Sequence, residues 1–184
     1  MPYGNTIKIV TFKLLTERIR QYINVDEFDC GNQRVNKYLK EDILDDVFHN
    51  TFVYIDAIKK RIIAFVTLSC SSIETCLENQ IIEFVEKVSA VEIKYFAISK
   101  EYQHMVYQPS SKDKLSDIIF DDIIENIRTL TNKYIRAGKI VLSSNISATS
   151  FFKKHGFKEF SDMIIISSID KGTPMFFDLF IEKE

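Results

Sequence analysis

The sequence predicts one α/β domain, and three of its features carry that prediction. The chain has 184 residues, a usual length for a single domain. Residues 51–58 and 61–70 are two β-rich runs around Lys59-Lys60, which is typical of an antiparallel hairpin. Farther along, a long amphipathic helical pattern is followed by an apolar strand and a short helix. We therefore expect residues 1–184 to form one domain with helices packed on a sheet.

Composition narrows the class of protein. Hydrophobic residues make up 46% of the chain and charged residues 27%, and no apolar run has the length of a membrane span. The N-terminal residues lack the pattern of a signal peptide, so we expect a cytoplasmic protein with no membrane partner. The formal net charge of −2 argues against a dominant nucleic-acid surface.

The cysteines and histidines suggest neither a metal site nor a catalytic thiol. Three cysteines, Cys30, Cys70 and Cys76, form no pattern of metal ligands, and a cytoplasmic chain would keep them reduced. No motif places a histidine beside any of them. We expect thiols without a catalytic role and no metal.

The first half of the chain begins with strand and helix patterns. Residues 7–12 alternate as a strand does, and residues 28–39 open a helical region that continues over 41–48. Residues 71–88 show no clear pattern. Residues 90–99 are the next expected strand.

The second half has a regular order of elements. We expect a helix that begins at Ser116 or Asp117, carries an apolar stripe and closes at Ala137-Gly138, and then a buried strand over 139–143. The stripe consists of Ile119, Ile123, Ile127, Leu130 and Tyr134. Residues 163–168 and 174–180 are expected to be closing strands joined by a turn.

Residues 145–157 predict a short helix with both ends marked. Asn145 is a good N-cap, and Gly156 can take the left-handed conformation that closes a helix. One face is apolar, with Ala148, Phe151, Phe152 and His155 at helical spacing.

This segment resembles a conserved segment of the GNAT superfamily of acyl-coenzyme A N-acyltransferases, which reads Asn-x-x-Ala-x-x-aromatic-aromatic-x-x-x-Gly-Phe. The matching residues are Asn145, Ala148, Phe151, Phe152, Gly156 and Phe157. The resemblance implies a mixed, mostly antiparallel, twisted sheet flanked by helices, with acetyl-CoA as the cofactor. The alternative interpretation is an amphipathic helix that merely ends at glycine.

A second segment resembles the start of one bacterial GNAT subgroup, which reads Phe-x-Cys-Gly-x-x-x-Leu-x-x-aromatic-Leu. The matching residues are Phe28, Cys30, Gly31, Tyr38 and Leu39. That subgroup includes toxin-like enzymes that acetylate aminoacyl-tRNA. In the family the first two helices line the acceptor site, so the acidic residues between Asp26 and Asp46 could attract an amine, although a solvated helix face is the more ordinary interpretation.

The resemblance also assigns roles on the strand over 90–99. Its ending, Phe96-Ala97-Ile98, is similar to the family strand whose main chain binds the pantetheine arm of the cofactor. Glu92 lies where such enzymes often place a base, and Tyr95 lies nearby. Their alternative roles are a solvent-facing strand residue and a packed aromatic ring.

The family's phosphate loop, Gln/Arg-x-x-Gly-x-Gly/Ala, is altered in this chain, because residues 101–120 contain no glycine. An alignment from Gln103 puts Val106 and Gln108 at the glycine positions. We prefer the alignment that puts Lys114-Leu115-Ser116 there, with an insertion around 106–110, because it explains where the helix starts. Lys114, Leu115, Ser116 and Asp117 are then the candidates at the pyrophosphate, although Asp117 adds an unfavourable charge.

A second departure concerns the proton donor to the leaving thiolate. Many family members have tyrosine at the position of Phe152, and phenylalanine keeps its shape without the hydroxyl. Tyr134 is a candidate replacement, although its place in the apolar stripe favours packing.

These residues lead to one preferred function and one alternative. The preferred function is direct acetyl transfer from acetyl-CoA to a primary amine of a small molecule or a macromolecule. In it Asn145 and Phe152 flank the thiol, and Glu92 or a water near it takes the amine proton. Aminoacyl-tRNA is a narrower acceptor that the net charge disfavours, and homodimers are a habit of the family. The alternative is a non-catalytic GNAT-fold binding protein.

Overall fold

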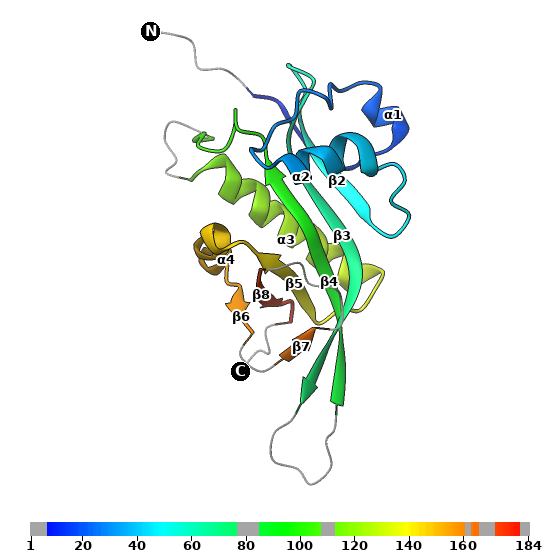
Figure 1. The fold of residues 1–184 in the computed structure, drawn as a ribbon, viewed down its shortest axis with the longest axis vertical. Coiled ribbons are helices and arrows are strands. Elements are labelled where there is room, and N and C mark those ends of the chain that lie inside the picture. The colour runs from blue at the N-terminus through cyan, green and yellow to red at the C-terminus, as the bar shows by residue number, and fades with distance from the viewer. Residues whose placement is uncertain (1–6, 77–84, 108–112, 161–162, 166–171, 181–184) are drawn as a thin grey trace. The chain divides into compact units, whose positions relative to one another are not determined.

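The computed structural model describes residues 7–76, 85–107, 113–160, 163–165 and 172–180 (Figure 1). The chain divides into two compact units. Unit 1 consists of Met1–Thr67 and Tyr95–Ile124, and unit 2 of Leu68–Lys94 and Glu125–Glu184.

The described strands belong to one mixed, mostly antiparallel sheet in the order β1-β2-β3-β4-β5-β8-β6, with β7 paired to β3. Strand β5 runs parallel to β4 and antiparallel to β8. Antiparallel pairing also joins β1 to β2, β3 to β7 and β6 to β8. The expected mixed, mostly antiparallel sheet is therefore confirmed.

Unit 1 contains the expected first strand and hairpin. Its elements are β1 (Ile9–Leu14), α1 (Glu17–Arg20), α2 (Gln33–Lys37), a π-helical turn (Tyr38–Asp42), β2 (Asn50–Asp56) and the start of β3 (Arg61–Cys76). The helical prediction for 41–48 was too long, because the π-helical turn ends at Asp42. A core of buried residues that includes Phe28, Leu39 and Phe65 lies among these elements.

The end of β4 (Val85–Ile98) and the start of α3 (Leu115–Lys133) complete unit 1. The Phe96 ring contacts Phe120 of α3 with the ring centroids 5.0 Å apart, whereas Tyr95 packs with the helical side of the core. Successive side chains of a strand point to opposite faces, so these two contacts place α3 and the α2 region on opposite faces of β4. The buried Tyr54 hydroxyl of β2 also donates a 2.7 Å hydrogen bond to Asp122 of α3.

Both predicted ends of the long helix were wrong by a few residues. The helix begins at Leu115, before the expected Ser116 or Asp117, because the Lys114 carbonyl already accepts from the N–H groups of Asp117 and Ile118. It ends at Lys133, well before Ala137-Gly138. The Gly138 N–H instead donates to the Ser89 carbonyl of β4, which draws these residues toward the strand.

Unit 2 contains the rest of β3, β4 and α3, followed by β5 (Lys139–Ser144), a 3₁₀ turn (Ile146–Ala148), α4 (Thr149–Lys154), β6 (Lys158–Glu159), β7 (Met163–Ile165) and β8 (Thr173–Asp178). Buried Ile73, Ala90 and Val141 form its core with Phe160 and Phe176.

The strands predicted over 139–143 and 174–180 are confirmed in β5 and β8. Of the strand predicted over 163–168, residues 166–168 lie outside the described residues. Residues 71–76 and 85–88, which showed no clear pattern, extend β3 and β4.

The short helix of unit 2 is capped differently at its two ends. Gly156 has a φ of +86°, as predicted for a left-handed closing residue. Asn145 is not a side-chain cap, because its side chain makes no capping bond. The Asn145 backbone carbonyl instead accepts from the Ala148 N–H and the Thr149 hydroxyl.

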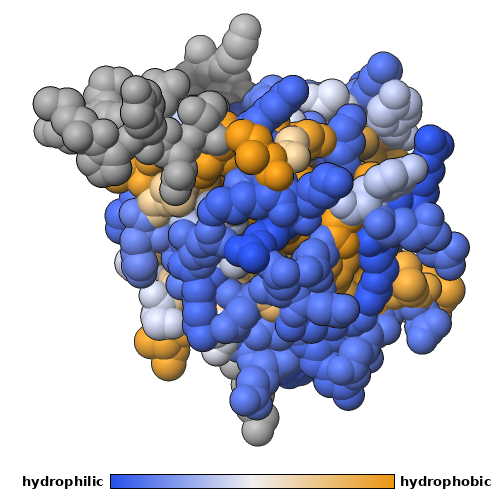
Figure 2. All heavy atoms as spheres, turned by 90° about the horizontal axis from the view of Figure 1, so that it is seen from above, coloured by the Kyte–Doolittle hydropathy of each residue, from blue (hydrophilic) through white to orange (hydrophobic). Residues whose placement is uncertain are grey.

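The face seen in Figure 2 is covered mainly by hydrophilic residues, with hydrophobic ones in smaller separate groups. None of the described helices is long and apolar enough to cross a membrane. Within the same residues, no group of three or more His, Cys, Asp or Glu side chains is placed to hold a metal ion.

Candidate functional site

The predicted site residues are divided between the two units. Unit 1 holds the candidates for cofactor binding on β4 and α3: Phe96, Ala97, Ile98, Lys114, Leu115, Ser116 and Asp117. Unit 2 holds Glu92, Tyr134, Asn145 and Phe152. The geometry of each set is described within its own unit.

In unit 1 the end of β4 is held by side-chain and backbone bonds. The Ser99 N–H donates to the Ile63 carbonyl of β3, which keeps the strand in register past its last residue. The Gln103 amide donates to the carbonyls of Ile98 and Cys30, at 2.9 and 3.0 Å. Gln103, one candidate start of the phosphate loop, therefore ties two segments of the protein together.

Just before α3, the two ends of the preceding loop are held together. Val106 and Lys114 form an antiparallel bridge, and the Leu115 N–H donates to the Met105 carbonyl at 2.7 Å. The chain thus leaves at Val106 and returns beside it at Lys114. The alignment that puts Lys114-Leu115-Ser116 at the glycine positions, with an insertion around 106–110, stays a prediction.

Side chains at this helix start differ in exposure. Lys114 is exposed, Ser116 is half-buried and Leu115 is fully buried. The Asp117 side chain is only 6% exposed and has its own interaction within the protein. A phosphate at this helix N-terminus would therefore meet an ammonium group and a hydroxyl, and the charge of the buried Asp117 carboxylate would oppose it.

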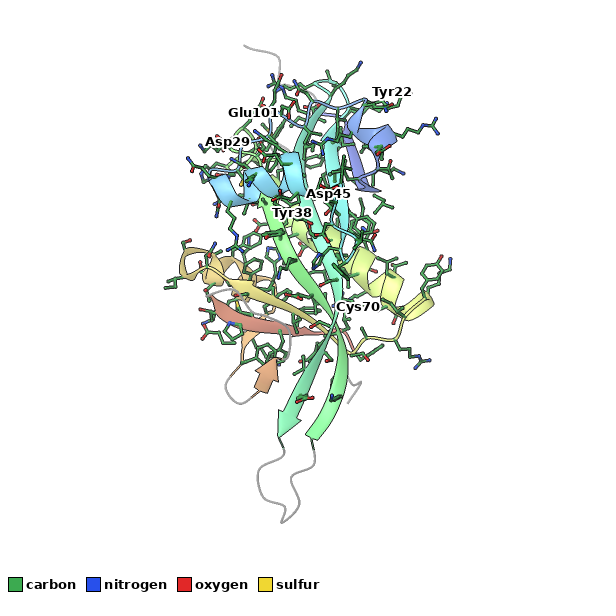
Figure 3. The ribbon with its side chains drawn as sticks, turned by 45° about the vertical axis from the view of Figure 1, so that its right-hand side comes forward. Tyr22, Asp29, Tyr38, Asp45, Cys70 and Glu101 are labelled. Atoms are coloured by element: carbon green, nitrogen blue, oxygen red, sulfur yellow. The ribbon has the colours of Figure 1, made fainter. Side chains whose placement is uncertain are left out.

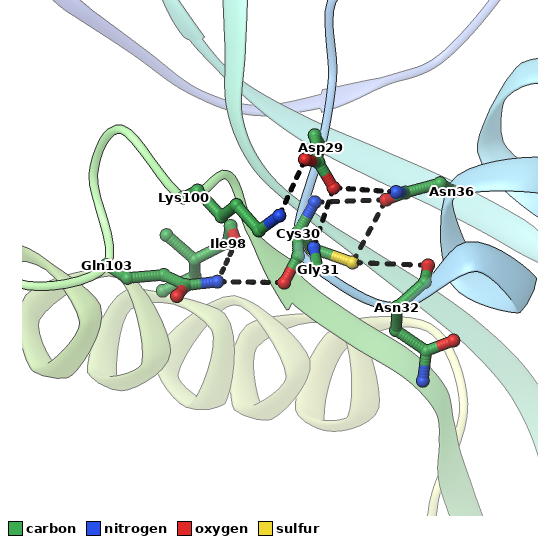
Figure 4. A network of polar contacts seen from close by, with 8 residues as sticks. All are labelled: Asp29, Cys30, Gly31, Asn32, Asn36, Ile98, Lys100 and Gln103. Atoms are coloured by element: carbon green, nitrogen blue, oxygen red, sulfur yellow. Dashed lines mark hydrogen bonds and ion pairs between the residues drawn. The ribbon is translucent and has the colours of Figure 1, made fainter.

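The Phe-x-Cys-Gly segment of unit 1 forms a tight polar turn (Figure 4). The Asp29 carboxylate accepts from the Gly31 N–H, the Asn36 amide and the Lys100 ammonium, at 2.8, 2.8 and 2.9 Å. The bond from Lys100, followed by those from Gly31 and Asn36, holds the pKa of Asp29 well below its usual range. Together with Gln103, this carboxylate fastens the turn to the residues that follow β4.

Cys30 is a structural thiol within this turn. Its Sγ lies 3.1 Å from the Asn36 side-chain oxygen, and burial raises the pKa of the thiol. A protonated thiol is a poor nucleophile, so burial keeps Cys30 in its less reactive form.

A second polar cluster of unit 1 lies between the π-helical turn and β2. Asp46 accepts from the Tyr38 hydroxyl at 2.8 Å and lies 2.7 Å from the His49 ring. Tyr38 is labelled in Figure 3. The Thr51 and Thr67 hydroxyls are joined at 2.8 Å and are buried. Burial and the bond to Asp46 raise the pKa of Tyr38 to about 12, so its hydroxyl stays protonated. The sequence analysis did not single out this cluster, and the three-residue spacing of Asp46 and His49 is the one local signal for it.

In unit 2, Glu92 lies on the part of β4 that pairs with β5. Val91 and Ile93 are buried, and Glu92 points to the opposite face, half-buried. Its carboxylate accepts from the Ser69 hydroxyl at 3.3 Å. Glu92 is thus an oriented carboxylate rather than a freely solvated one.

Phe152 of unit 2 is 8% exposed and packs in a run of aromatic rings. It contacts Phe151 and Phe157 edge to face, with centroids 5.4 and 5.9 Å away, and Phe157 in turn contacts Phe177. The ring therefore has a packing role whether or not it also meets a ligand.

Tyr134 was wrongly predicted to continue the apolar stripe. It lies past the last helical residue and is 68% exposed, and the Lys133 ammonium lies 5.2 Å from its ring centroid. Its hydroxyl is free to meet solvent or a ligand, so its role as an acid stays a prediction.

Asn145 borders a hollow within unit 2. The hollow has a volume of about 580 Å³ and is lined by Asn145, Ile146, Ser147, Gly172 and Thr173. A Cβ on Gly172 would come within 2.4 Å of the Ser143 hydroxyl and 2.8 Å of the Ser144 carbonyl. Only glycine lets β8 start this close to the end of β5.

Comparison with solved structures identifies the fold. A bacterial toxin superimposes with a TM-score of 0.71 and 16% identity, covering 95% of this chain and 92% of the toxin. AtaTR bound with AcCoA superimposes with a TM-score of 0.66 and 14% identity, over 94% of each chain. The chain has the GNAT fold. AtaT complexed with acetyl-methionyl-tRNAfMet is similar as well, with a TM-score of 0.66 and 15% identity over 93% of this chain and 95% of AtaT.

The comparisons support the GNAT fold through similarity of structure and not through similarity over the whole sequence. No protein-family model matches the chain, and no curated protein sequence matches it. At 14–16% identity the likeness shows the fold and leaves open which residues act. Membership of the Phe-x-Cys-Gly subgroup stays a prediction, and in this GNAT-fold chain that segment has a structural use of its own.

Proposed function

We propose that the protein transfers an acetyl group from acetyl-CoA to a primary amine. The observation that carries the proposal is the GNAT fold shared, over 94% of each chain, with a structure bound with AcCoA. The amine nitrogen would attack the thioester carbonyl carbon directly. The C–N bond forms, the C–S bond breaks with its electrons on sulfur, and coenzyme A leaves as the thiol after taking a proton.

The proposal gives each element a role. The end of β4, Phe96–Ile98, would bind the pantetheine arm, and Lys114 and Ser116 would bind the pyrophosphate. Asn145 and Phe152 would flank the thiol. Glu92, held by Ser69, would contact the acceptor amine directly or through a water.

The donor site fits this assignment in part. An exposed ammonium and a half-buried hydroxyl at the N-terminus of a 19-residue helix suit a phosphate. Glycine, which would give the closest backbone approach, is absent from residues 101–120. We therefore expect binding that depends more on side chains than is usual for a glycine loop.

A second candidate function is a GNAT-fold binding protein without catalysis. It is favoured by Phe152, which cannot donate a proton and already fills an aromatic cluster. Such a protein would keep the fold and lose the response to acetyl-CoA.

Calorimetric titration with acetyl-CoA, paired with thermal melts, separates the two. We expect saturable binding and a higher melting temperature, because a ligand that binds only the folded state stabilises it. K114A should weaken binding by roughly tenfold through loss of one charge-assisted contact, and K133A, which removes an exposed lysine at the other end of α3, should not. No heat and no shift at millimolar acetyl-CoA would leave only the binding-protein function.

A screen of acceptors then tests the chemistry. Purified protein and radiolabelled acetyl-CoA would be incubated with small amines, lysine-containing peptides and charged tRNA, and the acetylated product would be counted. Label transferred to one class names the acceptor. Binding of acetyl-CoA without transfer to any acceptor would contradict the enzyme.

A further inference from the structure

His49 and Asp46 form a hydrogen-bonded pair in unit 1 that the roles above do not use. The His49 Nδ1 lies 2.7 Å from each Asp46 carboxylate oxygen. The same carboxylate accepts from the Tyr38 hydroxyl at 2.8 Å and from the backbone N–H groups of Phe48 and His49 at 3.1 and 3.2 Å. Four donors therefore hold this one carboxylate, and the carboxylate holds the imidazole.

The bond to Asp46 decides which ring nitrogen of His49 carries a hydrogen. Burial favours protonation of Asp46, but the bonds from His49, Tyr38 and the Phe48 N–H outweigh it and lower the pKa, so the group is ionised near neutral pH. An ionised carboxylate only accepts hydrogen bonds, so the His49 Nδ1 carries a hydrogen, and in the neutral ring Nε2 is the nitrogen with the lone pair. The His49 side chain is 23% exposed, and no hydrogen bond to Nε2 occurs within the part of the chain that the structure describes.

Tyr38 links the pair to the strand given to the donor. The Tyr38 ring packs on Tyr95 of β4 with the centroids 4.4 Å apart, and Tyr95 directly precedes Phe96–Ile98. On the facing strands the Tyr38 hydroxyl is bordered by the uncharged Thr51 and Thr67 hydroxyls. The titratable side chains of this described cluster are thus Tyr38, Asp46, His49 and Tyr95.

We infer that His49, in place of Glu92, is the base that takes the proton of the acceptor amine, with Asp46 as its positioning residue. The inference rests on the proposed function. The ammonium of the acceptor gives one proton to His49 Nε2, and the freed lone pair attacks the thioester carbon. The second proton lost by nitrogen goes to the departing thiolate, and His49 returns its proton to solvent. An imidazole suits this step because histidine exchanges protons near neutral pH, whereas carboxylates are weak bases there.

The test uses the full chain and an acceptor that the wild type acetylates. We expect H49N to lower kcat/KM by roughly 10²–10⁴-fold, with the KM for acetyl-CoA and the melting temperature unchanged. Added imidazole should restore part of the rate, because a diffusible base can occupy the space left by the ring. D46N should lower the rate without imidazole rescue, and H104N, which removes an exposed histidine of the same unit, should leave it unchanged.

The outcomes separate this inference from the proposed function. Wild-type rates in H49N would overturn the inference and leave acetyl transfer standing. Loss of activity in H49N with a lower melting temperature and no rescue would assign His49 to structure and also overturn it. A wild type that acetylates no acceptor would overturn the proposed function, and the role of His49 with it.

Discussion

Gly31 holds a backbone conformation that few other residues adopt, with a φ of +91°. An added Cβ would lie 3.1 Å from the Lys100 Cε, the flexible part of a side chain that can move aside. Backbone strain, rather than a clash, is therefore the main cost of a substitution at this turn.

We predict that G31A lowers the free energy of unfolding by about 1–2 kcal/mol, the usual cost of a left-handed conformation for a residue with a Cβ. Urea denaturation followed by circular dichroism measures the change. G31N is the matched control and should lose less, because asparagine tolerates this conformation. Equal stability of all three proteins would mean that the turn relaxes to another conformation.

Phe152 gives the second prediction at the scale of one residue. If its ring flanks the leaving thiol, F152Y supplies the missing proton donor and raises kcat, by roughly a hundredfold for a well-placed general acid. F151Y adds the same hydroxyl to the neighbouring ring of the cluster and should leave kcat unchanged. The measurement is the rate of coenzyme A thiol release. Equal rates in both variants would place the thiol elsewhere.

Among the elements, the turn over 29–36 and the residues after β4 are clamped through one carboxylate. Asp29 accepts from Gly31 and Asn36 on its own segment and from Lys100 on the other. Its pKa is lower in the folded protein than in the unfolded chain. Asp29 therefore contributes stability that is present above the unfolded pKa of about 4. That contribution is lost as the pH falls toward the folded pKa.

We predict that the free energy of unfolding of the wild type falls between pH 5 and pH 2, and that D29N makes this fall shallower. Urea denaturation at several pH values measures the slope. D26N removes an exposed aspartate of the same unit and should leave the slope as it is in the wild type. Identical slopes for D29N and the wild type would show that the clamp contributes nothing to stability.

The sequence indicated elements better than it indicated site geometry. The hairpin around Lys59-Lys60 and the glycine closing the short helix follow from adjacent residues, and both were predicted. The inward turn of Asp117 and the exposure of Tyr134 depend on how far α3 extends, which tertiary hydrogen bonds set. Local spacing could not show either.

For the whole molecule, the net charge of −2 bears on the choice of acceptor. Nucleic-acid affinity comes mainly from clustered cations that release counterions. We predict that uncharged tRNA binds no tighter than about 10⁻⁴ M at 0.15 M salt, the weak end of non-specific binding. Fluorescence anisotropy of labelled tRNA, repeated at low salt, measures this. Micromolar binding with a steep salt dependence would reveal a basic surface and revive aminoacyl-tRNA as the acceptor.

The sequence by itself determined the types of the main elements, and the segment from Asn145 to Phe157, by its resemblance to the GNAT superfamily, indicated the fold that the solved structures share. Periodicity and turn residues act between near neighbours, so they can be read along the chain. Tertiary structure alone decided that Asp29 meets Lys100, 71 residues away, and that the Tyr54 hydroxyl meets Asp122, 68 residues away. Such contacts depend on which segments pack together, and no local pattern carries that information.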